Sequence, residues 1–282
     1  MTCGNFYNMK RTPLLWLMVL LLIACGRTGA DEKRESVAMP AGVDHQPFEA
    51  LLKKYVDEQG LIDYGAWKGN AADLGALDEY LKQFAATGSE ATGAEKAASL
   101  TNAYNAFTIR TILTGYPIES IWATKEPFKG RRHKVGGREV SLDDIEHGSL
   151  IPLIGYQAHG VLVCAARSCP PLQRFAFRAA EFDEQMALAY RIWLSREDLN
   201  RFRPEQKKVE ISTIFEWFKE DFEKAGGIPV VLGRYAPEPV RAFAASGDYK
   251  IEYLPYDWGL NDQGDRGRSY TKLNQWFDNV FK

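Results

Sequence analysis

Hydrophobic residues recur at helical spacing in several stretches of the chain. Apolar side chains three and four positions apart share one helix face, so this pattern predicts amphipathic helices. The stretches that show it are residues 47–55, 74–84, 180–194 and 214–222. Residues 95–113 are instead apolar around almost the whole helix circumference, which predicts a buried helix at the centre of the fold.

Shorter segments predict strands and tight turns. Residues 132–135 and 138–140 flank the pair Gly136-Gly137, which predicts a hairpin turn because glycine tolerates positive φ. The apolar run from Val161 to Val163 is predicted to be a strand buried on both faces. Helices and short strands without a long linker predict one α+β domain, in which the central apolar helix packs on a small sheet.

The composition is that of an ordinary globular protein. The chain has 282 residues, of which 45% are hydrophobic, and a formal net charge of −2. It has no long block of one charge sign, so it offers no electrostatic surface for DNA or RNA, and we expect no nucleic-acid partner. We assign residues 43–282 to the α+β domain and expect no bound cofactor.

The first 42 residues are predicted to be a processing signal and a tether. A basic pair precedes an apolar stretch over residues 14–24, which is short for a membrane-spanning helix and typical of a signal peptide. The stretch ends in Leu-Ile-Ala-Cys25, which resembles the lipobox of bacterial lipoproteins, in which this cysteine is lipidated. We expect a signal peptide over residues 1–25 and a polar tether over residues 26–42.

Lipidation at Cys25 would make the membrane a partner of this protein. Gly26, rather than an aspartate, follows the cysteine, which resembles the class of lipoproteins sorted to the outer membrane of Gram-negative bacteria. The expected location is therefore the cell envelope, on the periplasmic face of the outer membrane.

The stretch from His159 to Pro171 carries the most concentrated candidate chemistry. It combines a histidine, two cysteines and a Pro-Pro turn. Pro170 disfavours the helical region for the residue before it, so Cys169 is expected on an extended loop just beyond the predicted strand. A thiol there can act as a nucleophile when an imidazolium or backbone N–H groups lower its pKa.

Polar residues on two predicted helices are candidate partners of this thiol. Asn102 and Asn105 share one face of the buried helix, where they either tie neighbouring loops to it or orient a catalytic group. The helix after the hairpin contains Asp143, Glu146 and His147. Asp143 and His147, four residues apart, can meet so that the carboxylate fixes the imidazole tautomer. Alternatively, the acids only favour the helix N-terminus and His147 is a surface residue.

Several segments together resemble one protein family. These segments are residues 102–106 (NAYNA), 141–147 (SLDDIEH), 164–171 (CAARSCPP), 214–222 (IFEWFKEDF) and 256–261 (YDWGLN). They are similar to the DUF547 family, a domain of unknown function, over residues 43–261. The sequence departs from the family at Leu100-Thr101, where Trp-Ile is usual. The resemblance implies a distant relationship to papain-like or transglutaminase-like cysteine hydrolases, and hence a Cys/His site.

One hypothesis is therefore acyl transfer, with peptide or amide bonds as substrates and cell-wall material as their expected source at this location. The assigned roles are Cys169 as nucleophile, His147 or His159 as base, Asp143, Glu146 or Asn105 as the group that orients the imidazole, and backbone N–H groups near Ser168 and Cys169 as the oxyanion site. A straight strand at about 3.3 Å per residue would hold His159 over ~15 Å from Cys169, which favours His147.

Two alternatives use the same residues differently. Cys164 and Cys169 are the only cysteines after the signal region, and an oxidising compartment favours a disulfide between them. The protein would then be a non-catalytic binding or structural module of the envelope. A zinc site formed by His147, His159, Cys169 and the carboxylates of the helix that contains Asp143 is the third hypothesis. No pair has a recognised ligand spacing, so we predict no metal.

Overall fold

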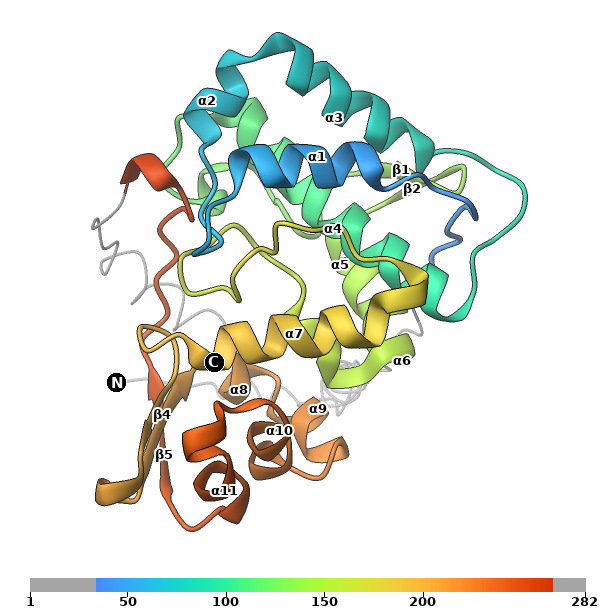
Figure 1. The fold of residues 1–282 in the computed structure, drawn as a ribbon. Coiled ribbons are helices and arrows are strands. Elements are labelled where there is room, and N and C mark those ends of the chain that lie inside the picture. Colours follow the sequence, from blue (N-terminus) through green and yellow to red (C-terminus); the bar gives the residue numbers. More distant parts are fainter. Residues whose placement is uncertain (1–33, 266–282) are drawn as a thin grey trace, which may run out of the picture. The chain divides into compact units, whose positions relative to one another are not determined.

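The computed structural model describes residues 34–265, and a long buried helix lies at its centre (Figure 1). This helix, α4 (Gly93–Gly115), coincides with the predicted apolar stretch and is buried from Ala97 to Ile109. A helix that is apolar around its circumference is stable only when other elements cover it on all sides. The predicted central helix is confirmed.

Other helices cover α4. They are α2 (Tyr64–Gly69), α3 (Ala71–Gln83), α5 (Leu142–Ile145), α6 (Ile151–Ile154) and α7 (Phe182–Ser195), and α1 (Gln46–Tyr55) packs on α2 and α3. In Figure 1, α1, α2 and α3 gather on one side of α4, and α7 runs on the opposite side. The sequence of α1 explains why it forms a helix and packs on the domain. Pro47 stands in its first turn, and Phe48, Leu51, Leu52 and Tyr55 form one buried face.

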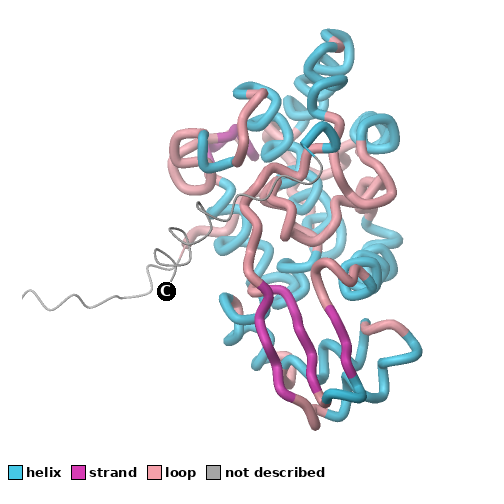
Figure 2. Tube along the Cα trace, turned by 90° about the vertical axis from the view of Figure 1, so that its left-hand side faces the viewer, coloured by secondary structure: helices cyan, strands magenta, loops and turns pink. Residues whose placement is uncertain are grey.

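Two small sheets complete the fold. The hairpin of β1 (His133–Val135) and β2 (Arg138–Val140) turns at Gly136 and Gly137, both with positive φ, as predicted. The second sheet has the order β3-β4-β5, and its strands lie side by side at one end of the domain (Figure 2). They are β3 (Arg201–Arg203), β4 (Lys208–Ser212) and β5 (Lys250–Leu254), with β4 antiparallel to β3 and parallel to β5.

Four short helices connect β4 to β5 along the chain. They are α8 (Ile214–Trp217), α9 (Lys219–Lys224), α10 (Ile228–Tyr235) and α11 (Glu238–Ser246). The predicted helix over residues 214–222 is thus divided in two, because the backbone leaves the helical region at Phe218. The predicted α+β class with one domain and small sheets is confirmed, although the main neighbours of α4 are helices and the sheet contacts α8.

The run from Val161 to Val163 is buried as predicted but is not a strand. It follows a turn of 3₁₀-helix (Gly155–Gly160) and continues as an irregular segment. A strand needs a neighbouring strand for its hydrogen bonds, and this segment lies against helix α4 instead. The strand prediction is therefore wrong.

The predicted tether also needs correction. Residues 34–42 pack against the domain rather than extend from it: Val37 and Met39 are buried, and Pro40 forms a β-bridge with Glu90. The Val37 N–H donates to Ser149 Oγ over 2.7 Å. The segment is polar on average, but its alternating apolar residues Val37 and Met39 indicate that one of its faces is buried. The predicted signal peptide, Cys25 and the rest of the tether lie outside the described residues.

Within residues 34–265, no helix combines the length and the apolar character that crossing a membrane requires.

Candidate functional site

The segment with the two cysteines is held by asparagine side chains of α4. We call residues 161–177 the motif loop. Asn105 Nδ2 donates to the Val161 carbonyl over 3.0 Å, and its Oδ1 accepts the Val163 N–H over 2.9 Å. The amide therefore satisfies the backbone donor and acceptor that a neighbouring strand would otherwise satisfy. This contact explains how an extended apolar run is buried without being part of a sheet.

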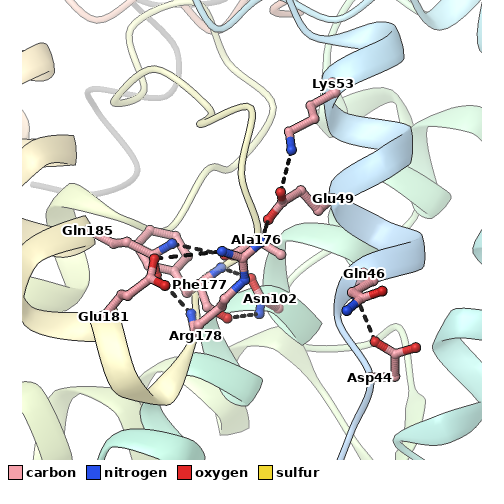
Figure 3. A network of polar contacts seen from close by, with 10 residues as sticks. All are labelled: Asp44, Gln46, Glu49, Lys53, Asn102, Ala176, Phe177, Arg178, Glu181 and Gln185. Carbon is pink, nitrogen blue, oxygen red and sulfur yellow. Dashed lines mark hydrogen bonds and ion pairs between the residues drawn. The ribbon is translucent and has the colours of Figure 1, made fainter.

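Asn102 repeats the arrangement at the other end of the motif loop. Its Nδ2 donates to the Phe177 carbonyl over 2.8 Å, and its Oδ1 accepts the Phe177 N–H over 2.9 Å (Figure 3). Both asparagines are buried, three residues apart on one face of α4. The structural hypothesis, that these residues tie loops to the helix, is confirmed. A catalytic role for Asn105 stays a prediction.

A polar network fixes the segment that follows Phe177. The Arg178 N–H donates to Gln185 Oε1, and Gln185 Nε2 donates to the Ala176 carbonyl (Figure 3). Arg178 and Lys53 both contact the carboxylate of Glu49 over 2.5 Å. Burial would raise the pKa of Glu49, but these two cations and the Ala176 backbone lower it instead. The motif loop is thus fastened at both ends.

The two cysteines form a disulfide across a tight turn. Cys164 and Cys169 have their Cα atoms 6.4 Å apart, within the range of ordinary disulfides. Ala165 adopts positive φ, and the Cys169 N–H donates to the Ala166 carbonyl. The C-terminal segment 256–262 supports the turn: the Arg167 N–H donates to Gly259, and the Asn261 N–H donates to the Ala165 carbonyl. The disulfide hypothesis is confirmed by this geometry.

Hydrogen-bond donors surround the buried sulfur of the pair. Cys169 is 4% exposed, whereas Cys164 is only half-buried. The Cys164 N–H donates to Cys169 Sγ over 3.1 Å. The Tyr256 hydroxyl lies 3.1 Å from Cys169 Sγ and 3.2 Å from Cys164 Sγ. The N–H groups of Ser168 and Cys169, predicted to hold an oxyanion, donate instead to the carbonyls of Asp257 and Ala166.

His159 lies on the 3₁₀ turn just before the motif loop, and its side chain is fully buried. Its Nε2 is 3.0 Å from Asp221 Oδ2, and its ring stacks on Phe218 at 3.8 Å between centroids. Burial lowers the pKa of His159, against the opposing effect of Asp221. Asp221, bonded to His159 and Lys224, has a pKa lowered to about 2. Nε2–H therefore donates to a carboxylate, and Nδ1 has no hydrogen-bond partner among residues 34–265.

The other candidate residues lie on α5 and the π-helical turn that continues it. Ser141 caps α5 in a capping box with Asp144. His147 Nε2 is 3.7 Å from Asp143 Oδ1, so the predicted pair on one helix face is present. Burial lowers the pKa of His147. Arg34 also forms an ion pair with Asp143 over 3.1 Å. A π-turn inside a helix is frequent at functional sites.

Glu146 is the carboxyl group with the largest upward pKa shift that the structure shows among the described residues. Burial and the neighbouring Asp143 raise its pKa to about 7, against the effect of a hydrogen bond from Tyr104. The charge of Asp221 adds to this increase. Burial raises the pKa of Tyr256, the hydroxyl that contacts both sulfurs, and the charges of Asp257 and Glu146 add to this increase.

Three residues of this cluster were not among the sequence-based candidates. They are Asp221, Tyr256 and Tyr104, which contribute the partner of His159, the hydroxyl at the sulfurs and the partner of Glu146. Each stands inside a segment that carried the family resemblance, so the signal was present, but no spacing indicated which residues meet. His159 was disfavoured as the base on the expectation of a straight strand up to Cys169, but this segment is irregular and turns at Ala165.

Among the described residues, no group of three or more His, Cys, Asp or Glu side chains is arranged to hold a metal ion. The His147, His159 and Cys169 set considered from the sequence is accordingly not brought together in that way.

The fold and the cluster define an α+β protein with a buried histidine–carboxylate pair near a disulfide turn. Residues 89–194 match the model of the family described as "Protein of unknown function, DUF547". The resemblance to DUF547 is thereby confirmed over α4, the hairpin, α5, the motif loop and most of α7. Asp221 and Tyr256 lie beyond the matched residues. No curated protein and no solved structure was found to be detectably similar.

Proposed function

We propose that this protein is a cysteine-dependent hydrolase or acyltransferase of the DUF547 type, with Cys169 as nucleophile and His159 as general base. The observation that supports this most is the buried imidazole of His159. Its Nε2 is held by Asp221, and its Nδ1 lone pair has no partner in the described part of the chain. A histidine whose one nitrogen is oriented by a carboxylate, while the other can accept a proton, is the arrangement of a general base.

The proposed reaction begins from the reduced protein, since the sulfur of a disulfide is not a nucleophile. The Cys169 thiol gives its proton to His159, and the thiolate attacks the carbonyl carbon of an amide. The C–N bond breaks, the amine leaves with the proton from His159, and a thioester remains on Cys169. Water then releases the acid, or a second amine takes the acyl group.

The surroundings of Cys169 support a stabilised thiolate. The Cys164 N–H and the Tyr256 hydroxyl both lie within hydrogen-bond distance of its Sγ. Donors to the charged form of an acid favour that form, so we expect these contacts to lower the pKa of the free thiol. His147, paired with Asp143, is the second candidate base.

The proposed location is the periplasmic face of the outer membrane, with peptide or amide bonds of cell-wall material as substrates. The lipobox-like sequence that ends at Cys25 supports the lipid anchor. Metabolic labelling with radioactive palmitate tests it: the full chain should incorporate label and sediment with membranes, and Cys25→Ala should do neither. Equal labelling of both chains would contradict the anchor.

The test of the catalytic proposal is the reactivity of Cys169 in the variant Cys164→Ser, in which no disulfide can form. The alkylation rate with iodoacetamide, measured from pH 5 to 10, should show an inflection at least about one unit below the free-thiol pKa of about 8.5. His159→Gln should remove this shift, and His147→Gln should leave it in place. If His147→Gln removes the shift and His159→Gln leaves it in place, His147 is the base.

A second function is supported by the disulfide itself. A Cys164–Cys169 bond that resists mild reduction, in a protein whose free Cys169 titrates like an ordinary thiol, would indicate a non-catalytic binding or structural module of the envelope. Intact mass with and without reductant measures the first property, and the alkylation profile measures the second. Both results together would overturn the catalytic proposal.

A further inference from the structure

The two sulfurs of the disulfide are not equivalent. Cys169 is buried to 4% exposure at the end of the turn, and Cys164 is half-buried at its start. Thiol–disulfide exchange requires an attacking thiolate to reach one sulfur in line with the bond that breaks, so access determines which sulfur is attacked. Exposure alone therefore favours attack on Cys164.

The hydrogen bonds favour the same direction. When Cys164 is attacked, Cys169 leaves as a thiolate, and a more stable thiolate leaves faster. The Tyr256 hydroxyl lies almost equally far from both sulfurs, at 3.1 and 3.2 Å, and so does not distinguish them. The Cys164 N–H does, because it donates to Cys169 Sγ over 3.1 Å. The better leaving group is thus the buried sulfur.

The turn is also held without the disulfide. Backbone hydrogen bonds fasten Ala165 to Asn261, Arg167 to Gly259, and Ser168 to Asp257. The Asp257 N–H returns a further bond to Ser168 Oγ over 2.8 Å. Breaking the S–S bond therefore leaves the two cysteines near each other, so that either can attack a mixed disulfide formed on the other.

We infer that Cys164 is a modification site for thiols, at which an external thiol enters the disulfide and Cys169 is released. A thiolate RS⁻ attacks Cys164 Sγ, an R–S–S–Cys164 bond forms, and the electron pair of the Cys164–Cys169 bond goes to Cys169. A second thiol then attacks the sulfur of R, which frees Cys164 and leaves the reductant as a disulfide. In the reverse direction, Cys169 attacks the mixed disulfide and closes the original bond.

This assignment gives the two cysteines different roles. Cys164 is the exchange cysteine, and Cys169 is the thiol that exchange exposes or protects. The inference goes beyond the proposed function, because the direction of exchange holds whether or not Cys169 attacks a carbonyl. If Cys169 is the nucleophile, the ratio of thiols to disulfides in the surroundings turns the activity on and off.

The experiment maps the first mixed disulfide in the oxidised full-length protein. The protein is treated with excess glutathione for seconds, quenched in acid before rearrangement, alkylated with iodoacetamide and digested. Mass spectrometry should show glutathione on Cys164 and the alkyl group on Cys169, in at least a tenfold excess over the reverse pattern. Equal amounts of both patterns, or glutathione mainly on Cys169, would overturn the inference.

Two further arms keep the result interpretable. His159→Gln should give the same mapping, so a failure of the catalytic proposal is distinguishable from a failure of this one. A dithiol protein of the thioredoxin type is compared with glutathione at equal thiol concentration. Faster reduction by the dithiol protein identifies a protein reductant as the source of the thiol, and equal rates identify small thiols; attack on Cys169 by both reagents would contradict the assignment.

Discussion

Two sets of buried polar groups lie in this domain, and they differ in how completely their hydrogen bonds are made. Asn102 and Asn105 each use their amide oxygen and nitrogen on backbone groups of the motif loop. His159 has one ring nitrogen bonded and one without a partner in the described chain, and Glu146 carries a raised pKa. A buried polar group costs free energy unless it is hydrogen-bonded. The first set is fully hydrogen-bonded and stabilises the loop. The second set has an unpartnered nitrogen on His159 and a disfavoured charge on Glu146, and it is where we place the chemistry.

The largest test of this comparison is Asn102→Leu. The substitution keeps the volume of the side chain but leaves the buried N–H and carbonyl of Phe177 without partners. Each unsatisfied group costs about 1–3 kcal/mol, so the free energy of unfolding should fall by about 2–5 kcal/mol. Urea unfolding measures it. Asn70→Ala is the matched control, because Asn70 only caps α3, and its loss should cost about 1 kcal/mol. Equal costs would contradict a special role of the amide.

Glu146→Gln tests the second set. The raised pKa of about 7 means that the folded protein favours the protonated carboxyl. The resulting stability is fully present below the unfolded pKa of about 4.5 and is lost as pH rises through 7. A neutral glutamine avoids this loss, so the variant should be more stable than the parent at pH 8, by about 1–3 kcal/mol, and not at pH 4.

Urea unfolding at both pH values measures the difference. Glu139→Gln, which alters an exposed carboxylate on β2, serves as control and should show no such dependence on pH. A Glu146→Gln variant that is less stable at every pH would indicate that the ionised carboxylate contributes to the fold.

His45, unlike His159, has a hydrogen-bond partner at each ring nitrogen. Its Nδ1 lies 2.8 Å from Tyr80 Oη and its Nε2 lies 3.1 Å from Ser99 Oγ. Burial lowers its pKa to about 4 from an unfolded value of about 6.5. The unfolded state then binds more protons between these values, so its contribution to stability is present above pH 6.5 and is lost as pH falls to 4.

His45→Gln should flatten this part of the stability profile, by about 1–2 kcal/mol in total once solvent screening is considered. His133, whose pKa is also lowered to about 4 by burial, contributes with the same sign. Thermal unfolding from pH 7.5 to 4.5 measures the slope. The neighbouring exposed substitution Gln46→Ala should leave the slope unchanged, and an identical slope in His45→Gln would refute the assignment.

The smallest effect is expected at the surface. Arg138 and Glu35 form an ion pair over 2.7 Å with side chains 50% and 75% exposed. Water already solvates both charges, so Arg138→Ala should change the free energy of unfolding by less than about 1 kcal/mol. A double-mutant cycle with Glu35→Ala measures the coupling. A coupling above about 2 kcal/mol would show that an exposed ion pair stabilises the fold as much as a buried hydrogen bond does. It would contradict burial as the cause of the difference between the two sets.

The local features of this protein are predictable from its sequence. Helix α4 follows from an apolar circumference, the hairpin from Gly136-Gly137, and the start of α5 from Ser141 with Asp144 three residues later. The lipobox-like end of the first 25 residues and the DUF547 segments are likewise sequence patterns, and the family match confirms the resemblance over residues 89–194. These signals are local because helix periodicity, turns and caps depend on residues a few positions apart.

Only the tertiary structure decided which distant residues meet. His159 pairs with Asp221, 62 residues later, and the sulfurs of Cys164 and Cys169 share Tyr256, about 90 residues further along. The sequence also suggested a strand at Val161–Val163, because it shows an apolar run but not the partner that satisfies its backbone. That partner is the amide of Asn105 on α4, a contact across 56 to 58 residues that chain topology, and not local spacing, determines.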